Sequence, residues 1–161
     1  MKTILILILI AFCFTVDAYS QKKAKSCSGN GYQGYFFDTS FMILKSIAKQ
    51  VKKVELNCTE VAVAEKILRK NLHQFTVGKI NQSHGCPDIS RKLAKYCRQY
   101  FGFQNANGER IVWINFFWDK SLFNQAQSGL IMVNDGCSYY WNVEVNLTKA
   151  VLSNLHINGK G

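Results

Sequence analysis

Sequence motifs of the common enzyme families are missing from this chain. It contains no glycine-rich phosphate-binding loop, no H-E-x-x-H and no G-x-S-x-G, the patterns of nucleotide-binding proteins, zinc proteases and α/β-hydrolases. Histidine is scarce, with three residues, and Asp and Glu together number only ten. Because general acid–base catalysis draws on these residue types, we expect a protein that is not an enzyme and that uses no cofactor.

Long apolar runs are also rare. The clearest one covers residues 4–14, which is shorter than the roughly 20 residues of a membrane-spanning helix. It follows Lys2 and precedes the small-x-small exit Ala18-Tyr19-Ser20, which is the pattern of a secretory signal peptide. We expect residues 1–20 to be this signal, cleaved after Ser20, with cleavage after Ala18 as the competing site. The mature chain is then secreted or periplasmic, soluble, and without a transmembrane helix.

Cysteine is present, but never in a C-x-x-C spacing, so a structural zinc site has little support. Removal of the signal leaves five cysteines: Cys27, Cys58, Cys86, Cys97 and Cys137. Disulfides form in an oxidising compartment, and an odd number leaves one thiol over. We expect two disulfides and one buried thiol, with fewer disulfides as the alternative. The pairing depends on distances between Cα atoms, so all five remain disulfide candidates.

Positive charge is concentrated in one half of the chain. Residues 45–98 carry twelve Lys and Arg against four Asp and Glu, whereas residues 99–161 carry four of each. A basic surface favours anionic partners such as nucleic acid, acidic glycans or a membrane surface, and export argues against nucleic acid. The alternative is a solvated helical surface that keeps the protein in solution.

Helical signals lie in the first half of the chain, after a lead-in at residues 21–35 that lacks periodicity and is expected to be mobile. A helix is predicted over residues 40–52, although residues 51–56 would equally suit a strand. The strongest helix covers residues 59–74. It begins at a capping box of Asn57 and Glu60 and turns Glu65 toward solvent. A third, short helix is predicted over residues 88–95, after Pro87, the single proline.

Strand signals dominate the second half. Residues 96–103 and 110–118 flank an Asn-Ala-Asn-Gly turn, and the second of these segments is apolar on both faces, as in a central strand. Residues 129–134, an Asp-Gly turn and residues 137–147 form a second predicted hairpin, and a last strand is predicted at 154–158. The fold class is therefore α+β: residues 36–161 form one domain with two or three helices on one face of a four- or five-stranded antiparallel meander.

Candidate binding residues come from two strands. Arg98 and Tyr100 belong to a stretch in which basic and aromatic residues are interleaved, a pattern that also suits anion binding. Asn142, Glu144 and Asn146 occupy the polar face of the strand at 137–147. The competing interpretations are strand burial for the first pair and a solvated sheet face for the second set.

Three segments carry a resemblance to a known group. They are Tyr-Cys-Arg-Gln-Tyr-Phe-Gly-Phe from residue 96, Asn-Gly-Glu-Arg-Ile-Val-Trp-Ile-Asn-Phe-Phe from residue 107, and Asp-Gly-Cys-Ser-Tyr-Tyr-Trp-Asn-Val-Glu-Val-Asn-Leu from residue 135. Together they resemble small, exported, uncharacterised bacterial proteins with helices followed by an antiparallel sheet. The resemblance implies an envelope or extracellular location and transfers no catalytic residue.

A weaker resemblance points to cystatins, which also place a helix before an antiparallel sheet. Gln74-Phe-Thr-Val-Gly78 is similar to the inhibitory Gln-x-Val-x-Gly loop, but Thr76 stands at its third position. The function we expect is binding of a protein or of an anionic envelope component by a non-enzymatic domain. The alternative is a cystatin-like protease inhibitor.

Overall fold

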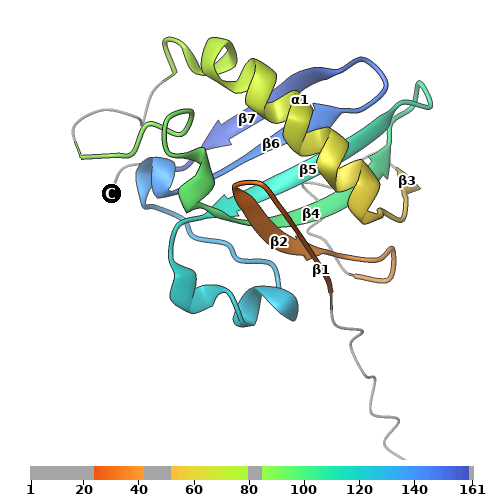
Figure 1. The fold of residues 1–161 in the computed structure, drawn as a ribbon, viewed down its shortest axis with the longest axis horizontal. Coiled ribbons are helices and arrows are strands. Elements are labelled where there is room, and N and C mark those ends of the chain that lie inside the picture. The colour runs from red at the N-terminus through yellow and green to blue at the C-terminus, as the bar shows by residue number, and fades with distance from the viewer. Residues whose placement is uncertain (1–23, 42–51, 80–84, 160–161) are drawn as a thin grey trace, which may run out of the picture.

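The computed structural model describes residues 24–41, 52–79 and 85–159. One long helix, α1 (Cys58–Thr76), lies across the strands of a single sheet (Figure 1). Within the described residues the strands are β1 (Lys25–Gly29), β2 (Tyr32–Phe36), β3 (Lys52–Lys53), β4 (Cys97–Gln104), β5 (Arg110–Phe117), β6 (Tyr140–Asn146) and β7 (Val151–Ile157). Four 3-10 turns lie between them: η1 (Leu93–Lys95), η2 (Lys120–Leu122), η3 (Gln125–Gln127) and η4 (Cys137–Tyr139).

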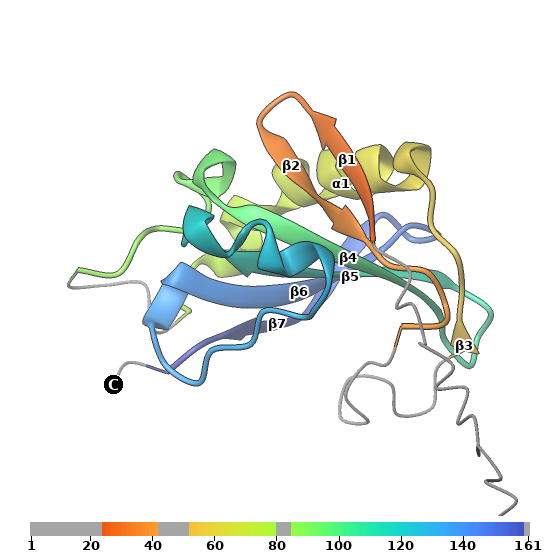
Figure 2. The same ribbon diagram turned by 90° about the horizontal axis from the view of Figure 1, so that it is seen from below.

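The sheet has the strand order β1-β2-β4-β5-β6-β7, and β3 pairs with the carboxyl-terminal end of β4. All its pairings are antiparallel except that of β2 with β4, which is parallel and places Tyr35 opposite Gln99. The predicted α+β class and the meander from β4 to β7 are therefore confirmed. The sheet is larger than predicted, because the amino-terminal hairpin adds two strands and makes it mixed. Figure 2 shows this hairpin standing beside α1.

Helix α1 begins where the capping residues predict. The Asn57 side chain accepts a hydrogen bond from the Glu60 amide at 3.0 Å, and the Glu60 carboxylate accepts one from the Asn57 amide at 3.2 Å, so two amides that the helix leaves unpaired are satisfied. The predicted apolar stripe is confirmed, with Val61, Leu68 and Leu72 buried. The prediction that Glu65 faces solvent is wrong: it is 1% exposed.

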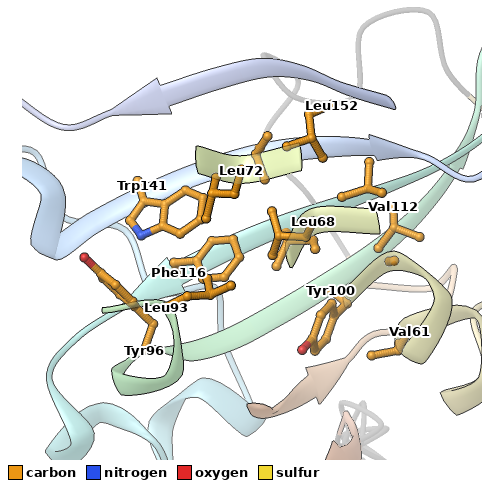
Figure 3. Close-up of a cluster of buried hydrophobic side chains, with 14 of the residues drawn as sticks. Val61, Leu68, Leu72, Leu93, Tyr96, Tyr100, Val112, Phe116, Trp141 and Leu152 are labelled. Carbon is orange, nitrogen blue, oxygen red and sulfur yellow. The ribbon is translucent and has the colours of Figure 1, made fainter. Parts of the chain in front are cut away.

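Two cores lie on opposite faces of β4 and β5, because alternate residues of a strand point to opposite sides. On the α1 side, Leu68 and Leu72 face Phe116 and Trp141 (Figure 3), whose rings stack with centroids 3.6 Å apart. The other side is lined by aromatic and aliphatic residues that include Phe101, Trp113, Phe117 and Ile131. These central strands are therefore buried on both faces.

The second core is covered by residues 118–134 rather than by a helix. The Gln99 side-chain amide donates to the carbonyl oxygens of Ala126 (2.9 Å) and Gly129 (2.7 Å), and its oxygen accepts from the Ile131 amide. Asn115 donates to the Ile131 carbonyl oxygen at 2.7 Å. These two buried amide side chains satisfy backbone groups that would otherwise lie unpaired in an apolar setting. This is why the strand predicted at residues 129–134 does not form.

The amino-terminal segment also differs from expectation, since β1 lies within the expected lead-in at residues 21–35 and β2 begins there and ends at Phe36. Gly34 permits their docking, because a Cβ atom there would collide with the carbonyl oxygen of Arg98 on β4. The disulfide between Cys27 and Cys58 ties β1 to the first residue of α1. Both constraints join residues distant in sequence. The local signal is the Asn30-Gly31 turn between paired Gly29 and Tyr32, but the flanking residues lack a clear apolar alternation.

The other two predicted helices have different outcomes. Most of the helix predicted at residues 40–52 lies outside the described residues, and Lys52–Lys53 form β3, as the competing strand interpretation allowed. Residues 88–95 form turns followed by η1, not a full α-helix. Within the described part of the chain, no helix is both long and apolar enough to cross a membrane.

Candidate functional site

Arg98, a predicted binding residue, has no exposed surface. Its Nε donates to Glu65 Oε1 at 2.9 Å, and its terminal nitrogens donate to the carbonyl oxygens of Tyr96 (2.5 Å) and Leu93 (3.1 Å). A guanidinium buried in an ion pair and bonded to backbone oxygens holds the fold together. It therefore fixes the segment before β4 against α1 and presents nothing to a ligand.

Tyr100, the second predicted binding residue, belongs to the same buried cluster. Its hydroxyl donates to Glu65 Oε1 at 3.0 Å. Burial, and then the neighbouring Glu65 carboxylate, raise the pKa of Tyr100 well above its usual value, so the hydroxyl keeps the proton that it donates. This side chain is likewise committed to the interior.

The polar face of β6 is divided between surface and interior. Asn142 and Glu144 are half-buried, and Glu144 accepts hydrogen bonds from Ser153 (3.2 Å) and Asn154 (2.8 Å) of β7. Asn146 is 6% exposed, and it donates to Glu109 at 2.7 Å. Of the five predicted binding residues, Asn142 and Glu144 are the two with surface available to a partner.

The cysteines form two disulfides, Cys27 with Cys58 and Cys86 with Cys137, and leave Cys97 as a buried free thiol. The prediction of two bridges and one thiol is confirmed, and the bridges fit an oxidising extracellular or periplasmic compartment.

A groove lies between the carboxyl-terminal half of α1 and the segment 85–95. It consists of two hollows of about 220 and 140 Å³ that share His73 and Ser90 in their linings. The cationic side chains of Arg69 and Arg91 line the larger hollow, and Leu72 and Leu93, both buried, form its apolar floor. The larger hollow therefore carries two cations beside apolar residues, whereas the lining of the smaller hollow includes the Asp88 carboxylate and no Lys or Arg.

Several bonds hold the 85–95 wall of this groove in place. The Cys86–Cys137 disulfide joins its start to η4, and the Ser138 hydroxyl donates to the Pro87 carbonyl oxygen at 2.5 Å. Asp88 Oδ1 accepts from the amides of Ser90 (2.9 Å) and Arg91 (3.1 Å). Together with the Arg98 bond to Leu93, these contacts fix the wall at both ends, so the groove is preformed.

The polar groups in the groove do not form a nucleophile–base–acid relay. Ser90 Oγ donates to Asp88 Oδ1 at 2.7 Å, and His73 Nδ1 lies 3.4 Å from the same hydroxyl oxygen. In a serine triad the carboxylate orients the histidine, whereas here it engages the serine. The arrangement suits binding.

A second, wider hollow of about 480 Å³ lies at the other end of η1. Lys95, Trp118, Asp119 and Lys120 line it. Ala94 lines the groove and Lys95 lines this hollow, so consecutive residues separate the two sites.

The predicted binding set omits the residues of the groove. The charge excess of residues 45–98 indicates the basic region, but its position in space depends on how residues 85–95 fold back onto α1. Among the described residues no group of three or more His, Cys, Asp or Glu side chains is placed to hold a metal ion. Comparison with protein-family models, with curated proteins and with solved structures finds no match for this chain.

Proposed function

We propose that this chain is an exported, non-enzymatic binding domain that holds an anionic polymer of the cell envelope in the groove between α1 and residues 85–95. The observation that carries this proposal is the pair of cations, Arg69 and Arg91, that line the larger hollow of the groove together with Leu72 and Leu93. Such a combination attracts negative charge at its rim and accommodates the apolar surface of a chain at its base.

Positive charge around the groove exceeds what internal partners neutralise. Residues 66–95 contain a single carboxylate, Asp88, and seven cations: Lys66, Arg69, Lys70, Lys79, Arg91, Lys92 and Lys95. Arg91 pairs with Asp88 at 3.3 Å and Arg69 with Glu65 at 3.7 Å, and all seven cations are exposed. The Arg91–Asp88 pair is exposed and therefore weak, and buried Glu65 is shared between Arg69 and Arg98, so the surface retains a positive field.

The test measures retention of the mature protein, beginning at Gln21, on an immobilised sulfated polysaccharide. The double variant Lys70→Gln with Arg91→Gln removes one charge from the lining of the groove and one from the residue of α1 that follows Arg69. We expect the variant to elute at clearly lower salt than the unaltered protein, because fewer cationic side chains then pair with the sulfate groups and displace their counterions.

The matched control is Lys52→Gln with Lys149→Gln. It removes the same charge, but from the opposite end of the sheet, where β3 pairs with Gln104 and Lys149 pairs with Glu109. Equal elution of the two double variants would contradict the proposal, because binding would then depend on net charge alone.

The alternative candidate is a cystatin-like protease inhibitor, favoured by one helix packed on the antiparallel meander β4–β7. The segment that is similar to the inhibitory loop argues against this alternative. Gln74, Phe75 and Thr76 lie in the last turn of α1, so the segment is mostly helical and not a hairpin loop. Inhibition of papain by the mature protein would favour this alternative over the binding proposal.

A further inference from the structure

The hollow beside Trp118 has an aromatic wall that is held rigidly. The indole ring packs edge to face against Tyr96 (centroids 5.1 Å apart, 85°) and against Tyr139 (5.4 Å, 86°). Tyr96 is itself fixed, since its hydroxyl donates to the Ser138 carbonyl oxygen at 2.5 Å. A ring packed against two aromatic neighbours in this way loses little further entropy when a ligand binds beside it.

Both signs of charge line this hollow. Lys95 and Lys120 supply two exposed ammonium groups. Asp119 supplies a carboxylate whose Oδ1 accepts from the hydroxyl (2.7 Å) and the amide (2.9 Å) of Ser121. These bonds hold the pKa of Asp119 below its usual value, so the group is an ionised acceptor at neutral pH.

We infer that this hollow binds one acidic sugar residue, so that the polymer in the neighbouring groove is an acidic polysaccharide. The C–H face of a pyranose ring, partly positive, packs on the electron-rich face of an indole. Sugar hydroxyls donate to the Asp119 carboxylate, and the acidic substituent pairs with Lys95 or Lys120. This inference rests on the proposed function, because Ala94 of the groove and Lys95 of the hollow are adjacent in η1 and one polymer is proposed to contact both sites.

A nucleic acid fits the same hollow less well. Bases also stack on tryptophan, and the Asp119 carboxylate repels phosphates and uronate carboxylates alike, so the hydrogen-bonding groups of the ligand decide between the two. A sugar ring instead presents several hydroxyl donors for which that carboxylate is the natural acceptor. The two disulfides also fit a compartment where extracellular glycans are the abundant polyanions.

The experiment uses tryptophan fluorescence of the mature protein. Trp113 and Trp141 are 4% and 1% exposed, whereas Trp118 is half-buried, so acrylamide quenching reports mainly on Trp118. Saturating tetragalacturonate should reduce the quenching constant, and maltotetraose, which is neutral, should not. Lys120→Gln should weaken tetragalacturonate binding about fivefold, the usual effect of removing one exposed charge, while Lys52→Gln should leave it unchanged.

Three results would overturn the inference. One is tetragalacturonate binding that leaves Trp118 equally quenched but is abolished by Lys70→Gln with Arg91→Gln; the groove proposal would then stand alone. Another is protection by maltotetraose equal to that by tetragalacturonate. The third is stronger protection by a single-stranded octanucleotide than by the uronate. If none of the polyanions binds at all, the proposed function fails together with the inference.

Discussion

Arg98 carries its positive charge inside the protein, and its contacts are all internal. Its guanidinium bonds to Glu65 and to the carbonyl oxygens of Leu93, Tyr96 and Gly31, and it lies 5.4 Å from the centre of the Phe116 ring. Removing one partner of a buried pair leaves the other charge without compensation. The end of the groove wall at η1 therefore depends on this side chain.

Arg98→Ala is expected to lower the free energy of unfolding by about 3–5 kcal/mol, the usual cost of an orphaned buried charge. Arg91→Ala, whose side chain is 79% exposed, should change it by less than about 0.5 kcal/mol. Urea unfolding of both variants measures the difference. Similar losses of stability in the two variants would mean that the Arg98–Glu65 pair is not structural.

Which residues share the interior can be predicted from sequence only in part. The apolar stripe of α1 and the alternation of β6 are strong periodic signals, and both are confirmed. The prediction for Arg98 is wrong because a basic residue between aromatics is typical of a binding surface as well as of a buried pair. The available signal is Glu65, which directly follows buried Ala64 and lies one turn after Val61, on the edge of the buried stripe.

The segment 85–95 has little regular structure and depends on side-chain bonds for its shape. Asp88 is the main organiser, since it accepts from Ser90 and from the Arg91 amide. Burial acts to raise the pKa of Asp88, but these hydrogen bonds and the Arg91 charge outweigh it, and the pKa is lowered from 3.8. A carboxyl with a lowered pKa stabilises the fold above its unfolded-state pKa and loses that effect as the pH falls through the folded-state value.

Asp88→Asn should therefore destabilise the protein by about 0.5 kcal/mol at pH 7, a small value because the side chain is largely solvated. The difference from the unaltered protein should shrink as the pH falls below 3.8 and through the lowered pKa of Asp88. Urea unfolding at pH 7, 4 and 2.5 measures it. A difference that stays constant over this range would show that the charge of Asp88 does not matter.

At the scale of elements, sequence signals are reliable where the stabilising contacts are local. The capping box of Asn57 and Glu60 and the turn before β5 are formed by neighbours in the chain, and both are predicted correctly. The segment β1–β2 depends on pairing with β4 and on a disulfide to α1. Such contacts have no counterpart in local composition. The Asn30-Gly31 turn is a local hairpin signal, but the absence of periodicity around it leads to the prediction of a mobile lead-in.

The molecule as a whole is cross-linked at two places and keeps one thiol inside. Cys97 is 1% exposed, and burial raises its pKa, so little thiolate is available. The mature protein should react with a thiol reagent only on unfolding, with one equivalent before reduction and five after it. More than one equivalent in unfolded, unreduced protein would contradict the two bridges, and fast reaction of native protein would contradict the burial.

The candidate site belongs to the whole molecule and cannot be located from sequence. Its basic character follows from the count of charges, but its shape requires η4, η1 and the end of α1 to meet. Trp118 is an example. As the last residue of an apolar run, it is predicted to belong to the buried strand. In the structure it packs against Tyr96 and Tyr139 and lines a hollow together with two lysines.

The parallel contact between β2 and β4 bears on how the chain matures. Polypeptides are synthesised from the amino end, yet Gln33 of β2 meets Cys97 of β4 across 64 positions. The first hairpin is therefore complete long before its partner strand emerges. Cys27 and Cys58 both precede that strand. Their disulfide can therefore form before β4 is available, and it then holds the hairpin against α1 until β2 pairs with β4.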